Sequence, residues 1–175
     1  MASRQAHVAT GWAAGVIAAA LVAHAGMVGP FHVWCVCAFI AGISGGTAPD
    51  WLEVAWWSRR RRLWIKHRTL THWGVAWIAL VMGSYWAMPC YPYAAVPFGF
   101  AVGGLMHLVC DTPNPYGVPW LLHRVSLNWW KSGRCDLFVV TFAWAAAVAA
   151  ADMVWFRSVH VRAAIVLMQS WHPFA

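Results

Sequence analysis

The sequence predicts an all-α integral membrane protein, a polytopic bundle of about five transmembrane helices. Of its 175 residues, 62% are apolar and only 10% are charged, whereas an average soluble domain has about a quarter charged residues. One small core could not bury this much apolar surface, so much of it must face lipid. The sequence has no low-complexity tract, glycine period or sustained heptad pattern, which excludes disordered, collagen-like and coiled-coil proteins.

Five apolar stretches approach the roughly 20 residues that a spanning helix needs. They cover residues 8–28, 31–49, 73–90, 93–111 and 136–156. Residues 157–171 alternate apolar and polar side chains, which is typical of an interfacial helix rather than a sixth span. The first stretch is longer than the apolar core of a signal peptide, so we expect it to be retained. Residues 1–175 are therefore predicted to form a single membrane domain, in which residues 136–175 supply the last span and an interfacial tail.

The basic residues predict the orientation of the spans. Ten of the 12 Lys and Arg residues lie in three segments that five spans would place on one face: Arg4; Arg59 to Arg62, Lys66 and Arg68; Arg124, Lys131 and Arg134. The positive-inside rule places this face and the N-terminus in the cytoplasm. The net charge of +7 then follows from topology and from contact with anionic membrane lipids, so no nucleic-acid partner is predicted.

Acidic residues are rare, and those at membrane depth predict function, because an unpaired carboxylate is costly there. Of the five acids, Asp50 and Asp111 fall at the cytoplasmic ends of the second and fourth spans. His107 precedes Asp111 by one helical turn, which puts both side chains on the same face. This pair could bind a metal ion, or it could form an ordinary hydrogen bond inside the bundle.

Histidines from two further spans are predicted to meet this pair at the cytoplasmic face. His7 begins the first span, and His67 and His72 open the third. Imidazole and carboxylate donors suit zinc first, with manganese or iron as alternatives. One or two divalent ions are expected. The candidate metal ligands are His7, Asp50, His67, His72, His107 and Asp111. The five cysteines are odd in number and scattered, so they predict neither a disulfide framework nor a cysteine zinc site.

Tryptophan and glycine positions predict how the bundle meets lipid and packs. Six of the 15 tryptophans lie near the cytoplasmic boundary: Trp51, Trp56, Trp57, Trp64, Trp129 and Trp130. This position is typical of an aromatic belt at the level of the lipid headgroups. A groove for a lipid substrate is the alternative interpretation. The pairs Gly11/Gly15 and Gly99/Gly103 have the small-residue spacing that lets helices pack closely.

Two longer motifs carry a family resemblance. Residues 66–72 read KHRTLTH, and residues 104–120 read GLMHLVCDTPNPYGVPW. Together they resemble the YdjM family of bacterial inner-membrane proteins, which pairs an H-R-x-x-T-H element with an H-x-x-x-D-x-x-x-P-x-G-V-P element. The family's early histidine and its Pro-Asp resemble His7 and Pro49-Asp50. The resemblance thus defines a metal-site region over residues 1–135.

One position departs from the family pattern. The family commonly has a second acid two positions after Pro-Asp, whereas this chain has Leu52 there and Glu53 next. Either Glu53 substitutes for that acid, or the second acidic ligand is missing. The order of the motifs also has a more distant likeness to zinc-dependent phospholipase C, which points to phosphoesters.

The resemblance implies a multi-pass metal-dependent hydrolase of the bacterial inner membrane, like a phosphoesterase or phospholipase. Its expected partners are membrane lipids and a lipid or membrane-proximal phosphoester substrate at the cytoplasmic face. Five ligand candidates would bind the metal, with Asp111 the best bridging group between two ions. His67 would be a ligand or a proton carrier, and Arg68 would grip phosphate oxygens. Thr71 and Asn114 would orient the ligands.

Two other functional classes stay open. A non-catalytic membrane assembly factor would use the metal as a structural element and dock a partner on the basic, Trp-rich face. A transporter would use intramembrane His and Asp as a relay, but the ionisable residues cluster on one face of the predicted bundle. The sequence does not predict an oligomeric state.

Overall fold

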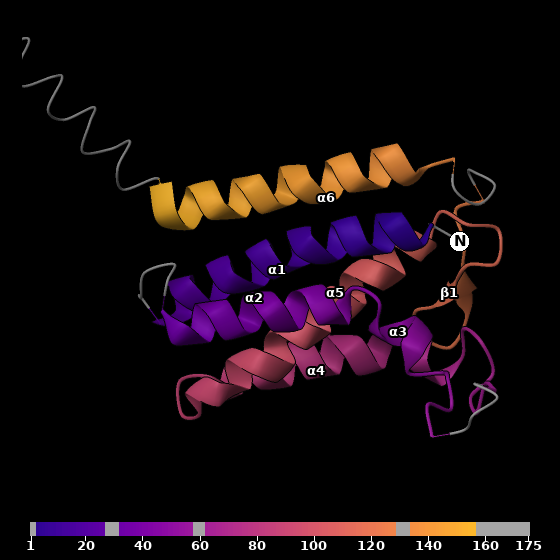
Figure 1. Cartoon of the computed structure of the whole chain (residues 1–175), viewed down its shortest axis with the longest axis horizontal. Coiled ribbons are helices and arrows are strands. Elements are labelled where there is room, and N and C mark those ends of the chain that lie inside the picture. The colour runs from indigo at the N-terminus through magenta and orange to yellow at the C-terminus, as the bar shows by residue number, and fades with distance from the viewer. Residues whose placement is uncertain (1–2, 27–31, 58–61, 129–133, 157–175) are drawn as a thin grey trace, which may run out of the picture.

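The structure, a computed structural model, describes residues 3–26, 32–57, 62–128 and 134–156. Its longer helices are α1 (Arg4–Gly26), α2 (Val33–Gly45), α4 (Gly74–Ala87), α5 (Ala95–Asp111) and α6 (Asp136–Ala151). They lie side by side along one bundle axis (Figure 1). The predicted helical class is therefore confirmed, whereas the predicted interfacial helix over residues 157–171 lies outside the described residues.

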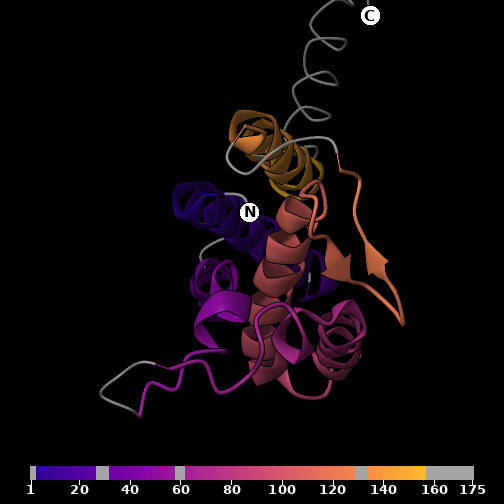
Figure 2. The same cartoon turned by 90° about the vertical axis from the view of Figure 1, so that its right-hand side faces the viewer.

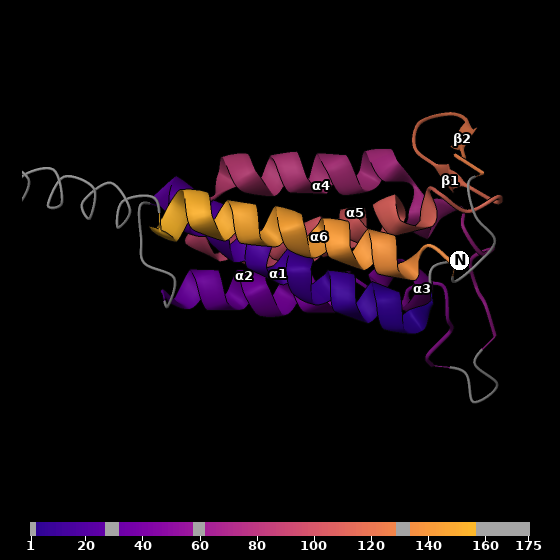
Figure 3. The ribbon, with the colours of Figure 1, turned by 90° about the horizontal axis from the view of Figure 1, so that it is seen from above.

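The short elements gather mainly at the end of the bundle that carries the N-terminus (Figures 1 and 2). They include α3 (Ala48–Trp51) and the 3-10 turn η1 (Leu70–His72). The strands β1 (Val118–Pro119) and β2 (Arg124–Val125) pair antiparallel there, with Val118 opposite Val125 (Figure 3). The 3-10 turn η2 (Pro92–Ala94) leads into α5, and the π-helical turn η3 (Asp152–Phe156) continues α6.

Within the described residues, three helical segments are long and apolar enough to cross a membrane: Arg4–Gly26, Pro92–Asp111 and Asp136–Phe156. The apolar helices α2 and α4 have 13 and 14 residues. At 1.5 Å per residue they reach only about 20 Å, against a hydrocarbon thickness of about 30 Å. The first of them stops early because the chain turns at Gly46 into α3, which has Pro49 in its first turn. The number of five spans therefore stays a prediction.

Helix α2 packs between α1 and α5, and glycines allow the backbones to approach closely. A Cβ atom on Gly103 of α5 would overlap the carbonyl oxygen of Gly42, and one on Gly99 would overlap that of Ala38. On the other side of α2, a Cβ on Gly15 would lie 2.7 Å from the Phe39 carbonyl oxygen. The close packing predicted for these glycine pairs is thus confirmed.

Replacing Gly103 by alanine is expected to lower the free energy of unfolding by about 1–3 kcal/mol, because backbone atoms cannot yield as a side chain can. Gly83 of α4 is the matched control, since a Cβ there would meet nothing within 4 Å. Gly83→Ala is expected to add about 0.5–1 kcal/mol through helix propensity. Unfolding in detergent micelles measures both, and equal effects would contradict this packing.

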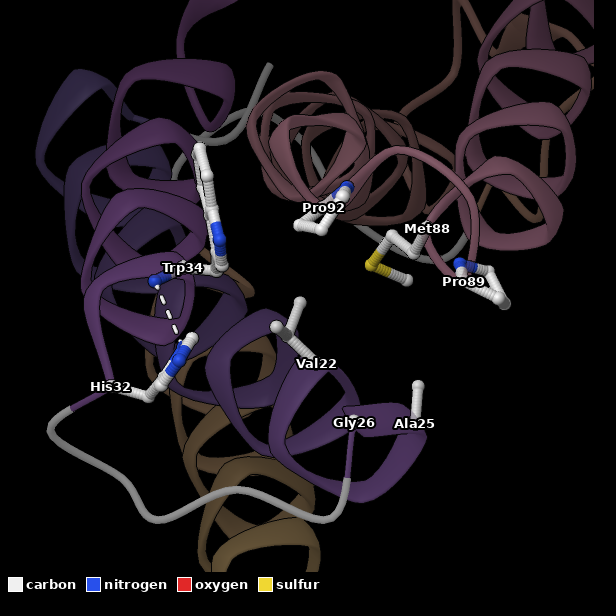
Figure 4. A pocket seen from close by; sticks show the side chains of 8 residues that line it. All are labelled: Val22, Ala25, Gly26, His32, Trp34, Met88, Pro89 and Pro92. Atoms are coloured by element: carbon white, nitrogen blue, oxygen red, sulfur yellow. Dashed lines mark hydrogen bonds between the residues drawn. The ribbon is translucent and has the colours of Figure 1, made fainter.

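A cavity of about 380 Å³ (Figure 4) lies where α1 ends and α2 begins, at the end of the bundle opposite α3 (Figure 1). Its lining comes from the end of α1, the start of α2 and the turn between α4 and α5: Val22, Ala25, Gly26, His32, Trp34, Met88, Pro89 and Pro92. His32 caps α2 there, because its Nδ1 accepts a hydrogen bond from the Trp34 backbone N–H at 3.4 Å. His32 therefore has a structural partner, at the end of the bundle away from the candidate metal ligands.

Candidate metal centre

Five of the six predicted ligands come together at the end of the bundle that carries the N-terminus. His7 lies in the first turns of α1, Asp50 in α3 and His72 in η1, while His107 and Asp111 come from the end of α5. They form two groups whose donor atoms lie within 4.8 Å of one another. One group is His7, His107 and Asp111, and the other is Asp50, His72 and His107. The helical crossings described above bring these four chain segments to one place.

The spacing within the second group fits a metal ion. The Oδ1 atom of Asp50 lies 3.5 Å from Nε2 of His72 and 3.6 Å from Nε2 of His107. A tetrahedral ion with bonds of about 2.0–2.2 Å separates its ligands by roughly 3.3–3.6 Å. All three donor atoms are buried and have no hydrogen-bond partner among the described residues. Since buried polar atoms are rarely left without a partner, the residues present fit a bound cation.

Hydrogen bonds at Nδ1 orient two of these imidazoles. Nδ1 of His107 lies 3.0 Å from the carbonyl oxygen of Gly46, which can only accept, so this nitrogen carries the proton. Nδ1 of His72 lies 2.9 Å from a carboxylate oxygen of Glu53. Both rings therefore direct the lone pair of Nε2 into the cluster. Metal-binding histidines usually have such a partner on the second nitrogen.

Glu53, whose role the sequence left open, lies behind His72. Its carboxylate is buried and accepts hydrogen bonds from the backbone N–H of Arg68 and from the Thr71 hydroxyl, each at 2.8 Å. His67 also contacts this carboxylate, because its Nδ1 lies 2.6 Å from Oε2 of Glu53. Glu53 therefore holds the H-R-x-x-T-H segment in place rather than facing the cluster. His67 is in neither ligand group, and its side chain is 39% exposed.

Arg68 and Asp111 form a buried ion pair beside the cluster. Nη2 of Arg68 lies 2.6 Å from Oδ2 of Asp111, and Nη1 donates to the Gly117 carbonyl at 3.4 Å. The other carboxylate oxygen of Asp111 accepts from the side-chain amide of Asn114 at 3.1 Å. Arg68 also adopts φ 58°, a left-handed conformation that costs a non-glycine residue about 1–2 kcal/mol. Its carbonyl oxygen is held by Arg124 Nη2 at 2.7 Å.

His7 stacks on the ring of His107, with centroids 3.8 Å apart and an interplanar angle of 15°. Its Nε2 lies 3.5 Å from Oδ1 of Asp111. Nε2 of His107 lies 3.9 Å from the other oxygen of Asp111. Asp111 thus belongs to the first group alone, and both of its oxygens already have protein partners, so its bridging role stays a prediction.

Asp50 is the accessible member of the cluster. Its side chain is 35% exposed, whereas the other four ligand candidates are almost completely buried. Burial opposes its ionisation, but the adjacent imidazoles of His107 and His72 outweigh burial, so the pKa of this carboxyl lies well below its usual range. Asp50 is therefore ionised near neutral pH. The cluster is therefore accessible from outside at the Asp50 side chain.

One comparison with known proteins identifies the family of this chain. The sequence profile of the family described as "YdjM inner membrane protein" matches residues 1–174. No curated protein and no solved structure matches the chain. The family match extends past the metal-site region to the last span and the tail. Because it covers nearly the whole sequence, the chain belongs to the YdjM family of inner membrane proteins.

Proposed function

We propose that this protein is a membrane-bound, metal-dependent hydrolase of phosphoester bonds, active at the cytoplasmic face of the inner membrane. One observation carries the proposal: the buried donor atoms of Asp50, His72 and His107 lie at ligand spacing around a common point. Zinc is the first candidate metal, with manganese or iron as alternatives, because two imidazoles and a carboxylate suit these ions.

The donor set favours one ion over two. His107 belongs to both ligand groups, yet its Nδ1 is used by the Gly46 carbonyl and one lone pair remains. An imidazole nitrogen binds a single ion, so the two groups compete for His107. A second ion would have to rely on His7 and on Asp111, whose oxygens are engaged by Arg68 and Asn114. We therefore assign Asp50, His72 and His107 as the primary ligands of one ion.

The surrounding residues suit hydrolysis of a phosphoester. A divalent ion would supply Lewis acidity for attack by water on phosphorus. Asp50 leaves one side of the cluster accessible to a substrate. Arg68 is buried and its charge is neutralised by Asp111, so it supports the site by holding this carboxylate in place. His67, half-exposed and bonded to Glu53, is placed to pass a proton between the site and water.

The orientation proposed from the sequence suits this site. Arg4, Arg62, Lys66 and Arg124 belong to the segments that carry or adjoin the cluster, so positive charge and ligands share one end of the bundle. The positive-inside rule then places the site at the cytoplasmic surface of a multi-pass protein. A reporter fused to the N-terminus should be protected from reagents added outside intact cells. Labelling from outside would reverse the proposed orientation.

The direct test is hydrolysis by the detergent-purified protein. Bis(p-nitrophenyl) phosphate and phosphatidylglycerol serve as substrates, before and after chelation and with zinc, manganese or iron added back. Asp50→Asn is expected to lower the rate by about 100-fold, as expected for damage to a metal site. Asp152→Asn, a carboxylate change at the far end of α6, should leave it unchanged. Absence of hydrolysis with every metal would refute the proposed activity.

Burial of four of the five ligand candidates supports a second possibility, a non-catalytic membrane factor with a structural metal ion. Structural sites are closed, whereas catalytic sites keep an open position. The exposure of Asp50 favours catalysis. A structural role predicts that chelation lowers thermal stability strongly while the protein shows no turnover with the ion bound.

A further inference from the structure

An apolar groove of about 340 Å³ lies beside the candidate metal centre. Ala76, Trp77 and Leu80 of α4 contribute to its lining, and Phe100 of α5 contributes from the neighbouring helix. The remaining lining residues come from the segment between α3 and the end of η1: Leu52, Trp64, Ile65, Leu70 and Thr71. This volume is within the range of about 300–1,000 Å³ that is typical of ligand pockets.

The polar side-chain groups of the groove are already used inside the protein. Nε1 of Trp64 donates to the Leu52 carbonyl at 2.8 Å, and Nε1 of Trp77 donates to the Thr71 carbonyl at 2.7 Å. The Thr71 hydroxyl donates to Glu53 at 2.8 Å. The lining therefore offers hydrocarbon and aromatic faces to an occupant. A chain without hydrogen-bonding groups suits it best.

The groove shares two chain segments with the metal centre. Thr71 precedes His72 in η1, and its hydroxyl bonds to the same carboxylate oxygen of Glu53 that holds the His72 ring. On the other wall, Leu52 follows Asp50, the accessible ligand candidate, by two residues. A molecule lying in the groove would thus lie against the two segments that carry Asp50 and His72. The exposed Lys66, next to Ile65 of the lining, adds positive charge beside them.

The surroundings of α4 indicate where the occupant comes from. Helix α4 carries exposed apolar side chains on more than one side, with Ile78 and Met82 on one face and Leu80 on another. In an inner membrane protein these apolar side chains meet lipid, since a large apolar surface is unfavourable in water. The groove therefore opens beside a helix face suited to hydrocarbon. Its other end reaches the basic segment at the proposed cytoplasmic surface.

We propose that this groove binds a hydrocarbon chain of a membrane lipid whose phosphate head lies at Asp50. The inference rests on the proposed function and makes its substrate a lipid phosphoester rather than a water-soluble one. The apolar walls hold the chain, and the cluster of Asp50, His72 and His107 faces the phosphate. Binding the chain along α4 places the phosphoester beside the open side of the cluster.

Photocrosslinking tests chain binding without any turnover. The full-length protein is placed in phosphatidylcholine vesicles that contain phosphatidylglycerol with a diazirine in one acyl chain, and labelled peptides are mapped by mass spectrometry. Ala76→Phe fills the groove, and Ala79→Phe adds the same ring to an exposed position of α4 outside the lining. Excluding two methylene groups already costs about tenfold in occupancy. Labelling of Trp77, Leu80 and Phe100 should therefore fall about tenfold in Ala76→Phe alone.

Two outcomes would overturn the inference. One is equal labelling of these residues in both variants, and the other is labelling in the unmodified protein no stronger there than on the exposed face of α6. The second outcome is measured on the unmodified protein, so it does not depend on whether a variant folds. Turnover separates this inference from the proposed function: in active protein, Ala76→Phe should slow phosphatidylglycerol hydrolysis about tenfold and spare bis(p-nitrophenyl) phosphate. Groove labelling with no hydrolysis of either compound would refute the proposed function and retain the lipid site.

Discussion

Replacing His107 by alanine is expected to remove the bound metal ion from the purified protein. Nε2 of His107 is common to both ligand groups, and Nδ1 is anchored to the Gly46 carbonyl. Because loss of an outer partner alone weakens metal binding by about 10–100-fold, loss of this ligand should lower the metal content to background. Elemental analysis of detergent-purified protein measures the change.

The matched control for this change is His24→Ala. His24 is an exposed histidine near the end of α1, at the other end of the bundle. We expect this variant to keep about one ion per chain, like the unmodified protein. A His107→Ala protein that elutes as a folded species and still holds its metal would disprove the assigned ligand set. An unmodified protein that takes up no zinc, manganese or iron would do the same.

Replacing Arg68 by methionine is expected to lower the free energy of unfolding by about 3–5 kcal/mol, the usual cost of breaking a buried ion pair. The change leaves the carboxylate of Asp111 in a buried site without its cation, which lies 2.6 Å away. It also removes the hydrogen bond to the Gly117 carbonyl. Chemical unfolding in detergent, monitored on metal-free protein, gives the free energy.

Lys66→Met is the control for charge, because Lys66 is exposed and lies two residues from Arg68. Surface changes of this kind stay within about 0.5 kcal/mol. The double variant Arg68→Met with Asp111→Asn should recover part of the loss, since the uncompensated charge is then gone. If Arg68→Met costs no more than Lys66→Met, the ion pair does not contribute to stability as proposed.

The position of the cluster followed from the sequence, because it depends on features that are local or set by topology. The i, i+4 spacing of His107 and Asp111 puts both on one helix face. The chain makes an even number of crossings between His7, Asp50, His72 and this pair, which returns each to the same end of the bundle. Glycine spacing likewise predicted the close contacts of α2 with α1 and α5, since only glycine allows backbones to touch.

The partners of individual side chains depended on the tertiary structure. Glu53 follows Asp50 by three residues, yet it bonds to His67 and His72 while Asp50 faces the cluster. Asp50 and Glu53 have different partners because α3 ends at Trp51, between them, and the bridge between Val54 and Leu63 turns the chain back toward η1. Arg68 and Asp111 are far apart in sequence, so their pairing could not be read from spacing.

The sequence by itself determined the class of protein and the residue types available at one end of the bundle, because composition and helical period act locally. Only the tertiary structure decided that His67 bonds to Glu53, that Asp111 forms an ion pair with Arg68, and that Asp50 is the accessible ligand candidate. These choices depend on distances between segments remote in sequence. They are set by how closely the helices pack and where the loops turn, which no local pattern encodes.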